Sequence, residues 1–140
     1  RTKSMLTMES ILAEKPDDPS ALNFVGYTLS LMDRDLERAE NLVRKALEIK
    51  PDDGYIMDSL AWVLFKRGKS DDALKFLEKA FIRVKSDPII SEHLGDVLTS
   101  KNRNQEAIEA YKKSMSLNPD NLLVQEKLKK LESITGASSN

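Results

Sequence analysis

A repeat period of about 34 residues is the feature of this 140-residue chain that most constrains its fold. Ala39, Ala73 and Ala107 are equally spaced at this period. Two further series, one of small residues and one of leucines, keep the same step with one additional residue in the first interval: Gly26, Ala61 and Gly95, and Leu29, Leu64 and Leu98. A fixed period of this length means that one supersecondary unit recurs and buries its apolar face against its neighbours. The period therefore predicts a stacked array rather than a bundle around one centre.

The spacing of apolar residues within one unit predicts helices. They recur at intervals of three and four residues in two successive stretches: Leu22, Val25 and Leu29, then Leu36, Ala39, Val43, Ala46 and Leu47. No stretch alternates with a period of two, so each unit is predicted to hold two amphipathic helices and no strand. The Asp-Pro pairs at 18–19 and 87–88 predict helix starts, because Asp caps a first turn and Pro needs no N–H there.

These positions resemble the pattern of the tetratricopeptide repeat family, whose helix-turn-helix unit recurs with the same period. The matching residues are Leu22, Val25, Gly26, Leu29, Ala39, Val43, Ala46 and Pro51 in a first repeat, Met57, Leu60, Ala61, Leu64, Gly68, Ala73, Leu77 and Ala80 in a second, and Leu94, Gly95, Leu98, Ala107, Tyr111 and Pro119 in a third. The resemblance implies an all-α fold, a right-handed superhelix of antiparallel helix pairs closed by a C-terminal capping helix. One extra residue at 32–35 predicts a longer turn in the first repeat.

The resemblance also divides the chain into repeats. The expected segments are the second helix of a truncated preceding repeat at 1–16, three repeats at 17–52, 53–86 and 87–119, a capping helix at 120–134 and a tail at 135–140. The first segment would lack the helix that normally covers it. Its apolar residues are therefore a candidate assembly face: Met5, Met8, Ile11 and Leu12.

Composition excludes several classes of function. With 22 Lys and Arg against 23 Asp and Glu, the formal charge is −1, so we expect no nucleic-acid partner. The absence of cysteine removes thiol catalysis and thiolate metal sites. The longest uncharged stretch, 21–32, is shorter than the roughly 20 apolar residues that span a bilayer, so we expect no direct membrane insertion.

A catalytic site would have to use His93, the single histidine. His93 and Asp96 are three residues apart on one predicted helical face, a pair that could ligate a metal or orient an imidazole. A site needs more ligands than this, so we interpret His93 as a packing residue. The acid pairs at 52–53 and 71–72 lie at predicted helix starts, where the helix dipole favours them. We predict no catalytic residue, no metal, no cofactor and no enzymatic activity.

The family resemblance implies a concave groove built from the first helix of each repeat. The positions that match are Asn23, Tyr27, Ser30, Tyr55, Asp58, Trp62, Phe65, Glu92 and Asp96, which we predict to be the partner-binding groove. Trp62 has two interpretations, ligand contact and packing between neighbouring first helices. For Phe65 we favour packing. The acids would steer a basic segment. Relatives that clamp chaperone tails use cationic and amide side chains here, so a chaperone-tail ligand is disfavoured.

Three segments, 22–29, 58–68 and 92–98, also resemble bacterial envelope-associated repeat proteins, some of which are outer-membrane lipoprotein adaptors. This resemblance implies an exported bacterial parent at the periplasm or outer membrane, with the cytoplasm as the alternative. The predicted function is a protein-binding scaffold that takes a basic or apolar peptide or helix. The alternative is a self-assembly module that stacks through the exposed first segment.

Overall fold

The computed structural model describes residues 2–136, with side chains from residue 7 onward. This part of the chain folds into eight α-helices: α1 (Thr2–Glu14), α2 (Pro19–Leu31), α3 (Leu36–Ile49), α4 (Gly54–Lys66), α5 (Ser70–Arg83), α6 (Pro88–Ser100), α7 (Asn104–Leu117) and α8 (Leu122–Thr135). It contains no β-strand, which confirms the predicted all-α class. None of the described helices is long and apolar enough to cross a membrane.

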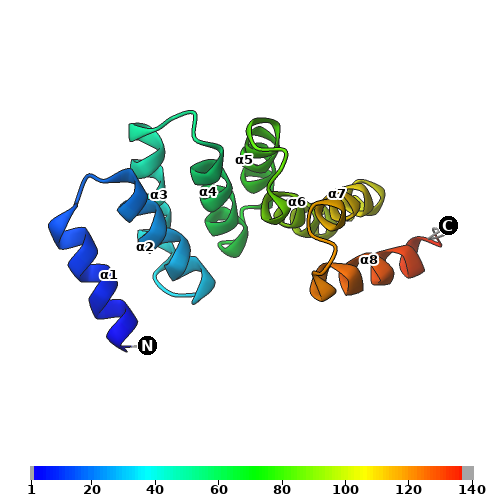
Figure 1. The fold of residues 1–140 in the computed structure, drawn as a ribbon, viewed down its shortest axis with the longest axis horizontal. Helices are drawn as coiled ribbons and strands as arrows, with labels where there is room; N and C mark the ends of the chain where they lie inside the picture. The colour runs from blue at the N-terminus through cyan, green and yellow to red at the C-terminus, as the bar shows by residue number, and fades with distance from the viewer. Residues whose placement is uncertain (1, 137–140) are drawn as a thin grey trace.

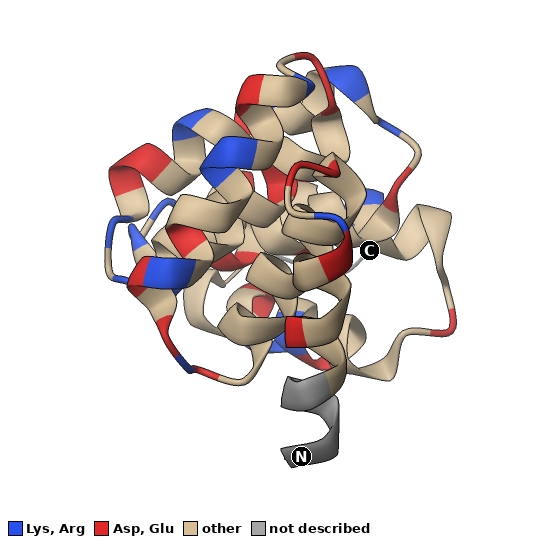
Figure 2. Ribbon diagram, turned by 90° about the vertical axis from the view of Figure 1, so that its left-hand side faces the viewer, with Lys and Arg blue, Asp and Glu red and all other residues tan. Residues whose placement is uncertain are grey.

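Helices that follow each other in the sequence pack as pairs, α2 with α3, α4 with α5 and α6 with α7, and α8 packs on α7. The pairs also stack, because α2 contacts α4 and α4 contacts α6. The result is an arch that runs from α1 to α8 (Figure 1), with the helices stacked one behind another when viewed from its end (Figure 2). This arrangement confirms the predicted solenoid, whose core extends along the array instead of gathering at one centre.

Aspartate caps begin the first helix of each repeat. The side chain of Asp18 accepts a hydrogen bond from the Ser20 amide at 3.0 Å, and that of Asp87 accepts one from the Ile89 amide at 2.8 Å. Asp53 accepts two, from the amides of Tyr55 and Ile56 at 2.9 and 3.1 Å. Both predicted Asp-Pro starts are therefore confirmed, because each cap satisfies amides that no preceding turn can reach.

The small-residue series let the two helices of a pair approach closely. A Cβ on Gly26 would lie 2.4 Å from Val43 Cγ2, and one on Gly95 would lie 2.5 Å from Tyr111 Cε1. The alanine series at 39, 73 and 107 is fully buried. A small residue therefore recurs at the positions where a larger side chain would force α2 away from α3 and α6 away from α7.

The turn between the two helices of the first repeat spans residues 32–35, one residue more than the equivalent turns at 67–69 and 101–103. Asp33 and Asp35 both have positive φ, at 53° and 46°. Gly68 and Asn102 occupy the same left-handed region in the shorter turns, with φ of 80° and 60°. The longer first turn is the one predicted from the extra residue in the sequence.

Candidate functional site

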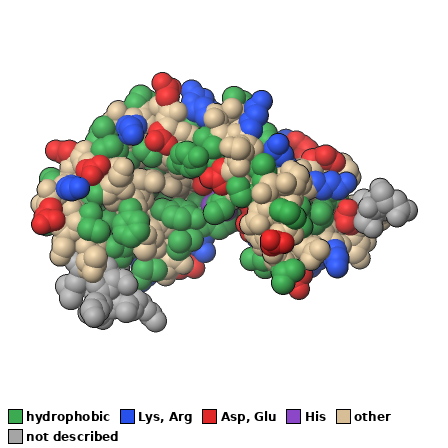
Figure 3. All heavy atoms as spheres, viewed as in Figure 1, with side chains coloured by type: hydrophobic (Ala, Val, Ile, Leu, Met, Phe, Trp, Pro, Cys, Tyr) green, Lys and Arg blue, Asp and Glu red, His purple; other side chains and the backbone are tan. Residues whose placement is uncertain are grey.

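The arch is hollowed on the side bordered by its first helices (Figure 3). In the space-filling view, hydrophobic side chains gather over α2 and α4 on one wall, and the single histidine is visible at its edge (Figure 3). The three first helices α2, α4 and α6 and the final helix α8 contribute the side chains described below. They include most of the residues that the sequence placed in a groove.

An aromatic cluster joins the first helices at the centre of this side. The Trp62 ring on α4 stacks on the His93 ring of α6, with ring centres 4.0 Å apart and planes 17° apart. The ring centre of Phe65 lies 5.3 Å from that of Trp62, and the ring centre of Tyr27 on α2 lies 6.4 Å from that of His93. Of the two interpretations of Trp62, the packing contact is observed. Its side chain nevertheless remains partly exposed, so ligand contact stays a prediction.

His93 is paired across two helices and not within its own. Its Nδ1 lies 2.8 Å from Asp58 Oδ1 on α4, and both side chains are buried. Asp96, the residue three positions further along α6, has other partners and does not form the pair considered from the sequence. The geometry fits a histidine that holds α6 against α4.

The remaining acids of the predicted groove are held by Lys127 of α8. Its ammonium group donates to Glu92 Oε2 at 2.9 Å and to Asp96 Oδ1 at 3.0 Å. Tyr111 on α7 donates its hydroxyl to the same Asp96 oxygen at 2.6 Å. Burial alone would lower the pKa of Lys127, but the hydrogen bonds to Glu92 and Asp96 outweigh it and raise the pKa. Sequence reasoning missed Lys127, although it lies one repeat period after His93, at the equivalent position of the next first helix.

The phenol of Tyr27 is in an environment that disfavours its ionisation. Burial, followed by the negative charges of Asp58, Glu92 and Asp87, raises the pKa of Tyr27 to about 12. The pKa of Tyr111 is raised as well, chiefly by burial and then by its hydrogen bond to Asp96. Both tyrosines therefore remain neutral hydrogen-bond donors across the physiological pH range.

The other predicted groove residues differ widely in exposure. Tyr55 on α4 is 55% exposed. Ser30 is fully buried, and its hydroxyl donates to the Tyr27 carbonyl at 2.6 Å. Asn23 is partly buried, and its side-chain oxygen has no hydrogen-bond partner among the described residues. Ile89, which also lies on a first helix, is 51% exposed.

The candidate assembly face is largely used within the chain. Met8 is only 2% exposed and belongs to the core, and Ile11 and Leu12 are partly buried. The side chain of Met5 lies outside the described residues. Two other large apolar residues are more exposed near this end, Phe24 at 51% and Leu31 at 56%, both on α2.

Comparison with known proteins places the chain among helical repeat proteins. The tetratricopeptide repeat-like domain family matches residues 28–133. A TPR repeat-containing protein of Pseudomonas aeruginosa is 37% identical over 86 residues, which cover 61% of this chain and 14% of that protein. The chain therefore spans only a small part of this relative.

Two solved structures share the fold at low sequence identity. The crystal structure of MamA superposes with a TM-score of 0.78 at 19% identity, covering 93% of this chain and 75% of MamA. The first TPR of Spaghetti (RPAP3), bound to the HSP90 peptide SRMEEVD, superposes with a TM-score of 0.79 at 17% identity. That match covers 85% of this chain and 94% of the other.

Proposed function

Because the chain belongs to the tetratricopeptide repeat family, we propose that it is a non-catalytic scaffold whose concave groove binds a peptide or helical segment of another protein. The observation that carries the proposal is the aromatic cluster on the first helices. Trp62 is stacked on His93, which in turn is held by Asp58, yet Trp62 keeps part of its surface open. A rigid aromatic anchor of this kind limits the ordering cost of binding.

The charge distribution narrows the chemistry of the proposed ligand. Asp58 faces His93, and Glu92 and Asp96 share Lys127, so each groove acid already has a partner within the chain. Little unpaired negative charge is left to steer a basic segment. The ligand we propose is therefore mainly apolar, with basic residues in a secondary role.

The structural neighbour bound to an HSP90 peptide offers a contrast. That peptide, SRMEEVD, carries three acidic residues. The cation that lies beside the groove acids, Lys127, is already shared by Glu92 and Asp96, so an acidic peptide would find no free cationic donor there for its carboxylates. We therefore propose that this groove selects against acidic chaperone tails.

Selection of peptides from a random display library with the intact chain, followed by calorimetric titration of the enriched peptides, tests the groove. We expect Trp62→Ala or Tyr27→Ala to weaken binding about tenfold or more, as loss of an aromatic anchor does. Ile82→Ala is the matched control, because Ile82 is an apolar residue 66% exposed on the second helix α5. Unchanged affinity in both groove variants, with helix content retained, would eliminate this groove as the site.

We further propose that this protein acts as an adaptor in a bacterial cell-envelope complex. The resemblance of 22–29, 58–68 and 92–98 to envelope-associated repeat proteins supports this role, and the Pseudomonas relative fits a bacterial source. Fractionation of cells that express the tagged full-length protein tests the location. Recovery in the periplasmic or outer-membrane fraction is expected, and recovery in the cytoplasmic fraction would contradict the proposal.

A second candidate function, self-assembly, is favoured by the exposed face of α2. Ser59 and His93, the residues equivalent to Phe24 in the next two first helices, are buried at 5% and 6% exposure, whereas Phe24 is 51% exposed. An additional helix stacked on α2 would cover it. Sedimentation velocity over a range of concentrations tests this, with Phe24→Ser expected to abolish association. A chain that remains monomeric throughout would exclude self-assembly through this face.

A further inference from the structure

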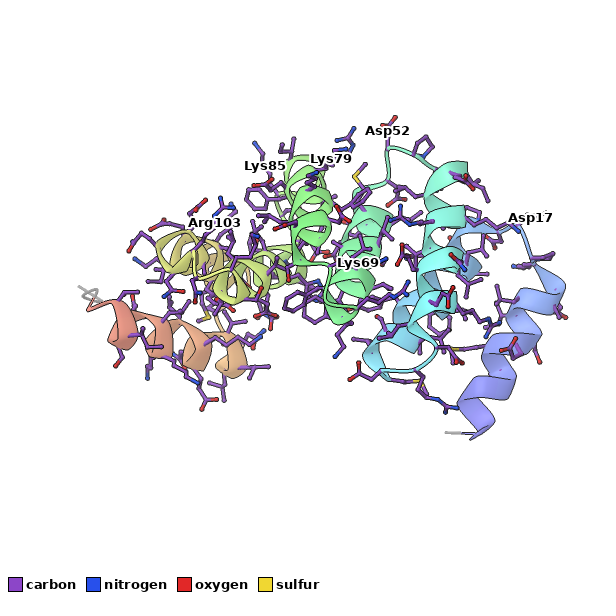
Figure 4. The ribbon with its side chains drawn as sticks, turned by 180° about the vertical axis from the view of Figure 1, so that it is seen from behind. Asp17, Asp52, Lys69, Lys79, Lys85 and Arg103 are labelled. Carbon is purple, nitrogen blue, oxygen red and sulfur yellow. The ribbon has the colours of Figure 1, made fainter. Side chains whose placement is uncertain are left out.

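A second hollow lies on the other layer of the array, between the second helices α3 and α5. It encloses about 540 Å³, within the range of about 300–1,000 Å³ that is usual for ligand sites. Met57 and Phe76 are among its apolar lining residues, and they are buried and partly buried respectively. Lys79 also lines it, on α5, whose end lies next to the turn that carries Asp52 (Figure 4).

Positive charge predominates around this hollow, because Arg44, Lys45 and Lys79 line it with one carboxylate, that of Glu48. Arg44 Nε forms an ion pair with Glu40 Oε2 at 2.8 Å. Lys45 forms an ion pair with Asp17, whose side chain is 79% exposed. The ammonium group of Lys79 lies 5.6 Å from the centre of the Phe76 ring. Among the side chains that the structure describes, Lys79 forms no ion pair, so its charge is available to a partner.

The next repeat supplies an internal comparison. An equivalent hollow of about 300 Å³ lies between α5 and α7, and it is lined by Glu78, Glu106 and Glu109 with Lys113 as its cation. Glu78 stands one repeat period after Arg44, at the same position of the repeat. The sign of the charge is thus reversed although the helix packing is the same. Stacking of the helices therefore does not require the cations of the first hollow.

We propose that the hollow between α3 and α5 is a second interaction surface, which binds an acidic segment of a partner protein. An apolar side chain of that segment rests on Phe76 and Met57, and its neighbouring carboxylates reach Lys79 and Lys45. A long polyanion such as a nucleic acid fits less well, because it would run on to the acidic hollow around Glu78 and be repelled there. The concave groove, whose acids are on the opposite layer, does not compete for such a segment.

Fluorescence anisotropy with a labelled synthetic peptide tests this surface. The probe is a Leu-Phe pair with three aspartates on each side, carrying a zwitterionic rhodamine dye. We expect the intact chain to bind it, and Lys79→Glu to weaken binding about tenfold or more. The reversal at Lys79 breaks no ion pair of the described structure, so the fold should be retained, as circular dichroism would verify. Lys113→Glu, the equivalent lysine of the second hollow, is the matched control and should leave the affinity within about twofold.

Three results would overturn the proposal. The first is the absence of peptide binding by the intact chain. The second is equal binding of a matched peptide in which lysines replace the aspartates, since the affinity would then not depend on the sign of the peptide's charge. The third is loss of binding in Trp62→Ala but not in Lys79→Glu, which would place the acidic peptide in the concave groove. Binding that depends on Lys79 and not on Trp62 supports the second surface.

Discussion

Replacing Gly95 by Ala tests the claim that the small-residue series sets the distance between the two helices of a repeat. A Cβ at position 95 would lie 2.5, 2.6 and 2.8 Å from three carbons of the Tyr111 ring. Carbon atoms in contact are normally about 3.5–4.0 Å apart. The ring has little freedom to retreat, because Tyr111 is 2% exposed and its hydroxyl is bound to Asp96. Either α6 and α7 separate or the ring gives up that hydrogen bond.

Two effects of opposite sign decide the magnitude. Alanine is the better helix former, which alone would stabilise the helix by about 0.5–1 kcal/mol. Overpacking a filled core costs about 1–3 kcal/mol, and contact with three ring atoms places this site in the upper part of that range. We therefore expect Gly95→Ala to lower the free energy of unfolding by about 1–2 kcal/mol.

The middle repeat supplies the compensating change. It carries Ala61 and Leu77 at the positions equivalent to Gly95 and Tyr111, and both are fully buried. In a Tyr111→Leu background the obstructing ring is absent, so Gly95→Ala should stabilise by about 0.5–1 kcal/mol. Urea denaturation of the four proteins, followed by circular dichroism, measures this coupling as a double-mutant cycle. Equal effects of Gly95→Ala in both backgrounds would refute the packing argument.

The other predictions concern charges and caps. Glu40 is 7% exposed and accepts from Arg44, Arg67 and Lys69, so Glu40→Gln should destabilise by about 2 kcal/mol at neutral pH. Burial raises the pKa of Glu40, but the hydrogen bonds from the three cations outweigh burial, so the net pKa is lowered. The difference in stability between the unchanged protein and the Glu40→Gln variant should therefore vanish in denaturation series as the pH falls through that lowered pKa. Lys127→Met should cost about 2 kcal/mol near pH 8. Because the pKa of Lys127 is raised, that cost should persist past about pH 10.4, the pKa of a free lysine, and disappear only as the pH rises further. Asp53→Ala should cost about 1 kcal/mol in thermal unfolding, through the loss of two capping hydrogen bonds.

The fold could be predicted because the period is imposed by packing. Gly26 and Gly95 each meet a second helix at close range, and Ala61, at the same position of the middle repeat, is fully buried, so a small residue recurs there in every repeat. The contacts between repeats carry no such constraint. Asp58 and His93 are 35 residues apart, and the pair recurs one repeat period later as Glu92 and Lys127, but a histidine is replaced by a lysine, so the spacing can be recognised as a contact only once the packing of α4 on α6 and of α6 on α8 is known. The acids of the groove were therefore predicted and their partners were not.

One position illustrates why the groove and the stacking of repeats are linked. Ser59, His93 and Lys127 follow each other one repeat period apart, and the latter two contact the preceding first helix through Asp58, Glu92 and Asp96. The side chains that face the hollow therefore also join one repeat to the next. Trp62→Ala removes the ring that His93 stacks on, so a loss of binding in this variant combines a lost anchor with a loosened α4–α6 contact. Tyr55→Ala separates the two effects, because Tyr55 is 55% exposed on the same helix and takes no part in that stack.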